Sequence, residues 1–94
     1  MTAYVYILAS RRNGTLYIGV TTQLAKRIAD HRAGMGSVFT AKYKVKRLVY
    51  MEVFDEIGAA RARESTLKHW RRGWKIRLIE ENNPNWHDLY DQIQ

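Results

Sequence analysis

The stretch "YVYILASRRNGTLYIGV", residues 4–20, decides the fold. Its two ends, "YVYILA" and "TLYIGV", are rich in the β-branched and aromatic residues that favour strands. Asn13-Gly14 between them is the strongest short signal for a hairpin turn. A two-residue loop here pairs positions whose numbers sum to 27, so even positions of the first strand share a face with odd positions of the second. The sequence therefore predicts a β-hairpin with two chemically different faces.

One face of this hairpin is rich in tyrosine and the other is apolar. Tyr4 and Tyr6 lie on the same face as Tyr17 and Gly19. The opposite face holds aliphatic side chains that are suited to packing against helices. These are Val5, Ile7, Leu16, Ile18 and Val20.

A helix is expected directly after the hairpin, from about Gln23 to Ala33. The threonines that precede it favour a helix N-terminus, and Gly34 favours its end. The stripe expected to face the core has the i, i+3, i+4, i+7 spacing of a buried helix face. It consists of Leu24, Arg27, Ile28 and His31, so two polar side chains lie within an apolar stripe.

The remaining chain predicts one more strand and three helices. Residues 34–47 contain glycine and several lysines without a helical period, so a loop is expected there. Residues 48–54, "LVYMEVF", predict a third strand, and residues 56–74 predict a second helix after Asp55, a good N-cap. A short helix is expected over residues 75–82 and a last one after Pro84. The tryptophans follow helical apolar spacings and are assigned to the core: Trp70, Trp74 and Trp86.

The composition favours a single domain, residues 1–94, with a polyanionic partner. The 16 lysines and arginines against 9 acidic residues give a formal charge of +7, which favours nucleic acid. A basic helix on a membrane surface is the second choice, because no segment has a clean apolar face opposite a basic one.

Several classes are excluded. The chain has no cysteine, which excludes a disulfide scaffold, a zinc ribbon and a thiol nucleophile. Its three histidines are too dispersed for a zinc cluster. The longest uncharged apolar run, residues 4–9, is far shorter than the ~20 residues of a membrane span and lacks the basic start of a secretory signal. A cytoplasmic protein is therefore expected.

Each polar residue on an inward stripe has an ordinary explanation. The aliphatic part of Arg27 can pack against the core while its guanidinium stays in water. His31 can be a buried histidine that is hydrogen-bonded to a backbone carbonyl. Glu64, on the apolar side of the second helix, has basic neighbours for a surface ion pair of about 0.5 kcal/mol. Tyrosines on a strand usually serve packing. Buried charges, however, tend to be paired or to gather at functional sites. On the pattern alone, separate ordinary residues and one shared polar site explain the sequence equally well.

The order of motifs resembles the GIY-YIG nuclease superfamily. "YVYIL" is followed by "LYIGVT", then by "KRIADH", and later by a glutamate within "ARARES". The segment "LKHWRRGWKIRLIEENNPNWHDLY" is similar to small stand-alone bacterial members, so the resemblance covers nearly the whole chain. It implies an α/β domain with a three-stranded antiparallel sheet flanked by helices. It also implies hydrolysis of phosphodiester bonds with one divalent metal ion, Mg²⁺ or Mn²⁺, and no small-molecule cofactor.

The resemblance carries five residues over as catalytic: Tyr6, Tyr17, Arg27, His31 and Glu64, with Glu64 as the metal ligand. The sequence departs from the family at the first glycine of the G-I-Y motif, where it has Tyr4. Replacing that glycine by tyrosine affects how a substrate approaches the site more than it affects the catalytic residues.

Each of these residue types suits a step of phosphodiester hydrolysis. One carboxylate can anchor a magnesium ion that keeps most of its waters. The arginine fork can hold two phosphate oxygens. A tyrosine has a pKa of about 10, so a general base among the two tyrosines needs help from Arg27 and the metal; which tyrosine it is stays open. His31 either relays the proton or holds a tyrosine hydroxyl.

The sequence thus predicts a metal-dependent DNA endonuclease with low intrinsic sequence specificity. Branched and single-stranded DNA are both open as substrates, and so is the oligomeric state. Basic residues flanking the site are expected to contact the DNA backbone: Lys42, Lys44, Lys46, Arg47, Arg61, Arg63, Lys68, Arg71 and Arg72. The alternative is a non-catalytic nucleic-acid-binding module with the same fold. A third possibility is an interaction domain for an acidic protein.

Overall fold

A three-stranded antiparallel sheet forms the centre of the molecule. The computed structural model describes residues 1–93. Strands β1 (Ala3–Ala9), β2 (Leu16–Thr21) and β3 (Arg47–Phe54) are arranged in the order β2-β1-β3. The first strand is therefore central, and β2 and β3 are the two edges. The expected fold class, an α/β domain with a three-stranded antiparallel sheet, is confirmed.

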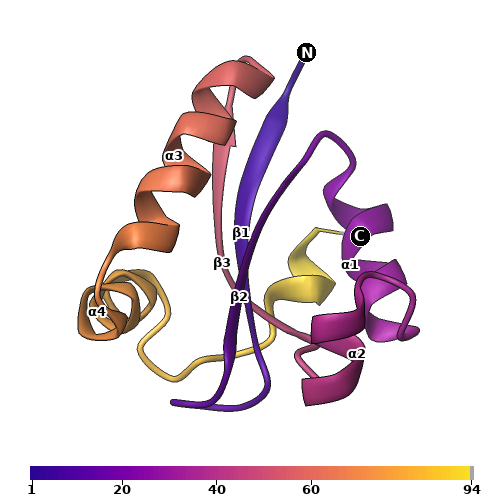
Figure 1. Ribbon diagram of the computed structural model, residues 1–94, viewed down its shortest axis with the longest axis vertical. Coiled ribbons are helices and arrows are strands. Elements are labelled where there is room, and N and C mark those ends of the chain that lie inside the picture. The colour runs from indigo at the N-terminus through magenta and orange to yellow at the C-terminus, as the bar shows by residue number, and fades with distance from the viewer. Residues whose placement is uncertain (94) are drawn as a thin grey trace.

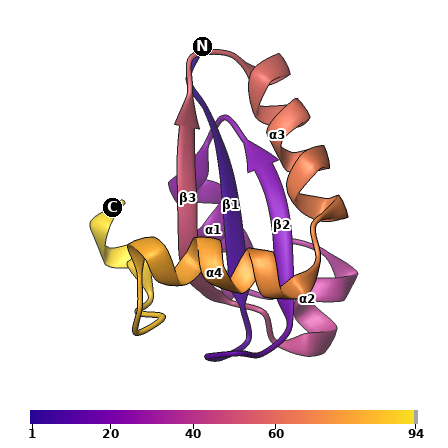
Figure 2. The same cartoon turned by 90° about the vertical axis from the view of Figure 1, so that its left-hand side faces the viewer.

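Helices cover both faces of this sheet (Figure 1). One face carries α3 and α4, and α4 crosses the strands at a steep angle (Figure 2). The other face carries α1, α2 and a 3₁₀ turn, η1. Their bounds are α1 Leu24–Arg32, α2 Val38–Tyr43, α3 Ile57–His69, α4 Arg72–Asn82 and η1 Leu89–Gln92. Within residues 1–93, no helix has both the length and the apolar character needed to cross a membrane.

The hairpin pairs two residues away from the predicted register. Tyr6 lies opposite Gly19, so paired positions sum to 25 rather than 27. The predicted two-residue turn is wrong because the connection is longer: the Ser10 N–H donates to the Thr15 carbonyl at 3.0 Å. Asn13 supplies the left-handed backbone inside it, with φ of 59°. A shift by two residues keeps every side chain on its face, so the predicted faces are confirmed.

Each face of the sheet has its own core. On the apolar face, the aliphatic residues of the hairpin pack with Ala60 and Leu67 of α3 and Ile79 of α4. On the tyrosine face, Tyr6 packs with Leu24 and Ile28 of α1. The tyrosine face is therefore buried as well, and the Tyr6 side chain is only 1% exposed.

Three predicted elements differ from the structure. The expected loop contains α2, which begins where the Thr40 N–H donates to the Ser37 hydroxyl at 3.0 Å. The predicted helix over residues 56–74 breaks at the extended backbone of Trp70 and Arg71, and α4 starts anew at Arg72. The last helix is reduced to a 3₁₀ turn whose Tyr90 N–H donates to Asp88 at 3.1 Å.

The tryptophans are only partly core residues. Trp86 is fully buried, as expected, and its indole N–H donates to Glu80 at 2.8 Å. Trp70 is half-buried, and Trp74 is 52% exposed, so the assignment of Trp74 to the core is wrong. The break before α4 is the physical reason, because it turns Trp74 away from the stripe that α3 buries.

Gly19 is required by the tyrosine that lies opposite it. A Cβ atom at this position would lie 2.4 Å from the Tyr6 hydroxyl oxygen and 2.5 Å from the ring carbon that bears it. The Tyr6 side chain is buried in the core and its hydroxyl is bonded to His31, so the ring has little space into which to move. The glycine of "YIG" is thus explained by close packing of Tyr6 rather than by backbone conformation.

We expect Gly19→Ala to lower the free energy of unfolding by about 1–3 kcal/mol, because the added methyl group overpacks the core. Urea denaturation measures this. Gly73→Ala is the matched control, since a Cβ there meets nothing within 4 Å and alanine favours a helix by up to about 1 kcal/mol. Equal effects of the two substitutions would show that Gly19 does not serve Tyr6.

Candidate active site

The hairpin and α1 bring three aromatic rings together. The ring centroids of Tyr6 and Tyr17 are 6.3 Å apart, and those of Tyr17 and His31 are 5.2 Å apart. The Tyr6 hydroxyl and His31 Nε2 form a buried hydrogen bond of 3.0 Å. The two tyrosines and the histidine expected from the sequence therefore form one cluster, although 25 residues separate Tyr6 from His31.

The other ring nitrogen of His31 has a partner that sequence reasoning missed. His31 Nδ1 lies 3.0 Å from the hydroxyl oxygen of Thr40, which itself lies 3.3 Å from the carbonyl oxygen of Ser37. If the Thr40 hydroxyl donates to that carbonyl, it accepts from the Nδ1–H of a neutral imidazole. Nε2 is then the acceptor for the Tyr6 O–H. This assignment satisfies every group in the chain of hydrogen bonds.

The segment between α1 and α2 closes over the histidine. A Cβ atom on Gly36 would lie 2.1 Å from His31 Nδ1, so only glycine fits where the backbone passes the ring. His31 is completely buried as a result. The available sequence signal was "GSVFT", in which Ser37 stands three residues before Thr40 in the spacing of a helix N-cap.

Burial shifts the proton affinities of both partners. Desolvation raises the pKa of Tyr6 to about 12, although the neighbouring Arg27 guanidinium lowers it. Desolvation also lowers the pKa of His31, and the positive charge of Arg27 adds to this. At neutral pH, Tyr6 is therefore a phenol that donates and His31 is a neutral imidazole that accepts.

Arg27 lies beside both tyrosine hydroxyls. Its side chain is half-buried, and hydrogen bonding to Tyr6, with a smaller contribution from Tyr17, raises the pKa of its guanidinium. A guanidinium remains charged in any case, so the cluster contains one permanent cation. The polar residue that the sequence placed on an inward stripe is thus directed at the tyrosine hydroxyls.

Glu64 belongs to the helical layer on the opposite face of the sheet (Figure 1). It belongs to α3, its side chain is 20% exposed, and its carboxylate lies 3.3 Å from Lys68 Nζ. The negative charge of Glu64 contributes to the raised pKa of Tyr6, so the two groups interact electrostatically. Of the five residues expected from the resemblance, Tyr6, Tyr17 and His31 are therefore in direct contact, and the charges of Arg27 and Glu64 both act on the pKa of Tyr6.

This carboxylate fits one kind of metal ion. Within residues 1–93, no group of three or more histidine, aspartate or glutamate side chains could hold an ion. A structural zinc ion needs four such ligands, so the described residues do not suit it. A single carboxylate with partial access to solvent does suit Mg²⁺, which binds through one or two carboxylates and keeps several waters. Glu64 is the residue of the cluster that would hold such an ion.

A groove runs along edge strand β2 beside the cluster. It has a volume of about 290 Å³ and is lined by Leu16, Tyr17, Ile18, Phe39, Lys68 and Lys75. The ring of Phe39 is 43% exposed and lies 6.2 Å from that of Tyr17. Sequence reasoning missed Phe39, which lies in the expected loop, and Lys75, which was not counted among the basic residues flanking the site.

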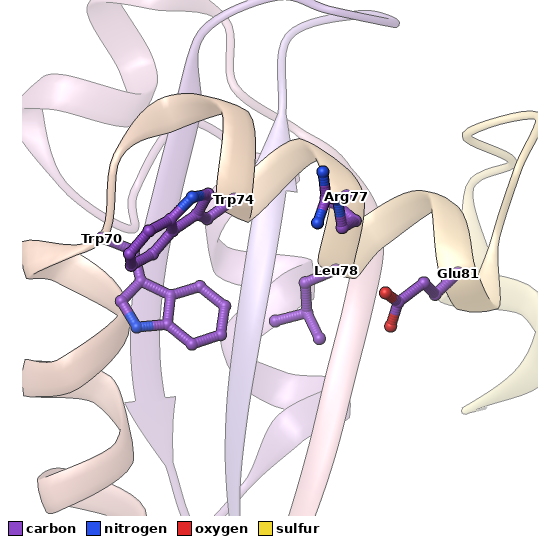
Figure 3. A pocket seen from close by; sticks show the side chains of 5 residues that line it. All are labelled: Trp70, Trp74, Arg77, Leu78 and Glu81. Atoms are coloured by element: carbon purple, nitrogen blue, oxygen red, sulfur yellow. The ribbon is translucent and has the colours of Figure 1, made fainter.

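Another hollow lies apart from the cluster (Figure 3). It has a volume of about 210 Å³ and is lined by Trp70, Trp74, Arg77, Leu78 and Glu81. The two indole rings meet edge to face at 5.9 Å. None of the five residues of the cluster contributes to it.

Four of the nine basic residues expected to bind DNA are held by acceptors within the protein. Arg63 grips the carboxylate of Glu52 through Nε at 3.0 Å and Nη2 at 2.9 Å. Arg72 donates to two carbonyls of the hairpin turn, at 2.7 and 2.6 Å. Arg47 donates to the Trp86 carbonyl at 3.1 Å. Lys68 pairs with Glu64. The others are exposed: Lys42, Lys44, Lys46, Arg61 and Arg71.

We expect the free energy of unfolding to decrease as the pH is lowered, because His31 is buried in its neutral form. Its pKa is lowered in the folded state, so the unfolded chain binds the proton more readily. The stabilisation is complete above the unfolded pKa of about 6.5 and is lost as the pH falls from there through the folded value. NMR titration of the histidines and urea denaturation from pH 7 to pH 5 measure this. A slope that His31→Asn leaves unchanged would contradict the assignment.

We expect Thr40→Val to lower the free energy of unfolding by about 1–3 kcal/mol, because the buried Nδ1–H of His31 loses its acceptor. Thr40→Ser keeps the hydroxyl and is expected to cost less. The ¹⁵N shifts of the imidazole report the tautomer, which should change in the valine variant alone. A tautomer that is the same in all three proteins would show that Thr40 does not position His31.

Comparison with known proteins assigns the family. The sequence pattern described as the GIY-YIG catalytic domain matches residues 2–77, which include the whole cluster. A UPF0213 protein of Staphylococcus haemolyticus is 41% identical over 78 residues, covering 83% of this chain and 94% of that protein. A UPF0213 protein of Natronomonas pharaonis is also 41% identical, covering 83% of this chain and 91% of that protein.

The fold has a solved counterpart. The solution NMR structure of a UPF0213 protein from Bacillus halodurans aligns with a TM-score of 0.58 and 32% identity, over 94% of this chain and 93% of that one. The names of these relatives state no activity. The fold, the matched sequence pattern and these relatives together confirm the resemblance seen in the sequence: the chain belongs to the GIY-YIG catalytic domain family, a nuclease superfamily.

Proposed function

We propose that this protein is a metal-dependent endonuclease that hydrolyses phosphodiester bonds in DNA with low intrinsic sequence specificity. One observation carries the proposal: the hydrogen-bonded pair of Tyr6 and His31 lies with Arg27, and Glu64 acts on the same hydroxyl from α3. A core histidine that served only packing would not need a cation and a carboxylate around its partner. The formal charge of +7 supports a nucleic-acid substrate.

The pair of Tyr6 and His31 is proposed as the proton acceptor. The Tyr6 hydroxyl points its proton at Nε2, so Tyr6 can take a proton from the attacking water while passing its own to His31. A free phenolate, which the raised pKa disfavours, is then never needed. Tyr17 is half-buried and lines the groove, where its hydroxyl would orient the phosphate or the water.

Charge stabilisation would come from both sides of the edge strand. Arg27 presents a planar fork that can bind two oxygens of the phosphate and stabilise the charge of the transition state. Glu64 would hold the divalent ion, which would supply Lewis acidity to stabilise the departing oxygen. Lys68 and Lys75, on the wall of the groove, would hold the neighbouring phosphates.

The alternative is a non-catalytic nucleic-acid-binding module with the same fold. Two observations favour it: Glu64 is engaged by Lys68 at 3.3 Å, and Tyr6 is only 1% exposed. Binding of metal and substrate would have to displace the lysine and open a path to the hydroxyl. The two functions make different predictions for Glu64.

We expect the protein to cleave DNA in the presence of Mg²⁺ or Mn²⁺, and Glu64→Gln to lower the rate by at least about 100-fold, because a metal site supplies several kcal/mol. Gel assays with plasmid, single-stranded and branched DNA measure this. Glu56→Gln, an exposed carboxylate at the start of the same helix, is the matched control and should keep the wild-type rate.

Two results would contradict the proposed endonuclease, and they lead to different conclusions. DNA binding without any cleavage beyond that of Glu64→Gln would exclude the enzyme and leave the binding module. If duplex DNA does not bind even at low salt, both nucleic-acid functions fail and an acidic protein becomes the expected partner.

A further inference from the structure

A pocket lined by cations lies apart from the catalytic cluster. It has a volume of about 370 Å³ and is formed by Ser10, Arg32, Lys44, Lys46, Arg47 and Asp88. These residues come from the position after β1, the end of α1, the segment between α2 and β3, the first residue of β3, and the residue before η1. Four cations and a single carboxylate leave an excess of positive charge in a polar hollow. None of the five residues of the cluster contributes to it.

Both guanidinium groups of this pocket are held in place before any ligand binds. Arg32 Nη1 lies 2.5 Å from a carboxylate oxygen of Asp88, and its guanidinium carbon lies 4.7 Å from the ring centroid of Tyr90. The other oxygen of Asp88 accepts from the Leu48 N–H at 3.3 Å and the Tyr90 N–H at 3.1 Å. Arg47 is anchored on the Trp86 carbonyl. The carboxylate is thus part of the scaffold, and preorganisation lowers the cost of binding.

The two lysines, in contrast, have no polar side-chain partner in the part of the chain that the structure describes. Lys44 and Lys46 are exposed, and neither forms an ion pair or a side-chain hydrogen bond within residues 1–93. Lys44 has a left-handed backbone, with φ of 56°, which ends α2 and turns the chain toward β3. Ammonium groups placed next to two guanidinium groups repel them, and an anion in the pocket would relieve this repulsion.

A neutral donor completes the lining. The hydroxyl oxygen of Ser10 accepts from the Thr15 N–H at 3.0 Å, so its own hydrogen is free to be donated. Fixed guanidinium groups, exposed ammonium groups and a hydroxyl together suit a tetrahedral oxyanion with several acceptor oxygens. A carboxylate ligand would leave donors unused.

We propose that this pocket binds a phosphate group of the nucleic acid at a second site, outside the catalytic cluster. The identity of the ligand as nucleic acid rests on the proposed function. The phosphate comes either from the backbone of the strand or from its phosphorylated end. Because α1 carries both Arg27 of the cluster and Arg32 of the pocket, a strand bound at both would be fixed in position relative to the cleavage site.

The test measures binding in the absence of turnover. A Glu64→Gln protein in EDTA is titrated with a fluorescent single-stranded oligonucleotide that bears either a 5′-phosphate or a 5′-hydroxyl. Lys44→Gln/Lys46→Gln is compared with Lys26→Gln/Arg77→Gln, which removes the same charge from other surfaces. We expect the pocket variant to lose at least about tenfold in affinity and to lower the slope of log K against log salt by about two, and the control to lose less than threefold.

The two oligonucleotides distinguish the source of the phosphate. A preference for the 5′-phosphate strand that disappears in the pocket variant identifies the strand end as the ligand. An equal loss for both strands identifies a backbone phosphate.

Equal losses in the pocket variant and the control would overturn the inference, because charge alone would then explain binding. Binding at the pocket by a wild-type protein that never cleaves DNA would overturn the proposed function and leave the phosphate site in place.

Discussion

The buried hydrogen bond between Tyr6 and His31 is the interaction on which the site depends, because it joins the central strand to α1 across the tyrosine face. Both groups are withdrawn from water, so each needs a complete set of partners. Thr40 supplies the second acceptor for the histidine. Gly19 and Gly36 leave the space that the two rings fill. The glycine of the YIG motif, the short helix α2 and the closed segment before it are therefore consequences of one polar contact.

Placing β2 at the edge of the sheet has an equally direct effect on chemistry. Tyr17 and Phe39 border the groove from the side of α2, and Lys68 borders it from α3. A central strand would have a hydrogen-bonded neighbour on each side, and the helices of the two faces would be separated by the sheet. At an edge, groups from both faces can act on one phosphate. This arrangement allows Glu64 to influence the Tyr6 hydroxyl from the opposite layer.

The sequence predicted the faces of the hairpin better than its register. Tyr6 and Tyr17 lie on the expected side although the pairing is displaced by two residues, because side-chain direction in a strand depends only on parity. The break after His69 was not predictable from helical periodicity. It accompanies the contact of Arg72 with the carbonyls of Asn13 and Gly14, which lie more than fifty residues away in the chain. Local patterns carry no information about such partners.

The sequence by itself determined the family and the residues that gather at the candidate site, because ordered motifs and the strand and helix periods are local properties of the chain. Only the tertiary structure decided which cations remain available to a ligand. Arg72 is expected from the sequence to contact nucleic acid, yet two backbone carbonyls accept hydrogen bonds from its guanidinium, whereas Lys44 and Lys46 keep their charge for a ligand. The reason is that every residue carries a backbone carbonyl oxygen, whatever its side chain. The sequence therefore does not show which carbonyl will accept a hydrogen bond from a given arginine, because the fold decides which groups lie close together.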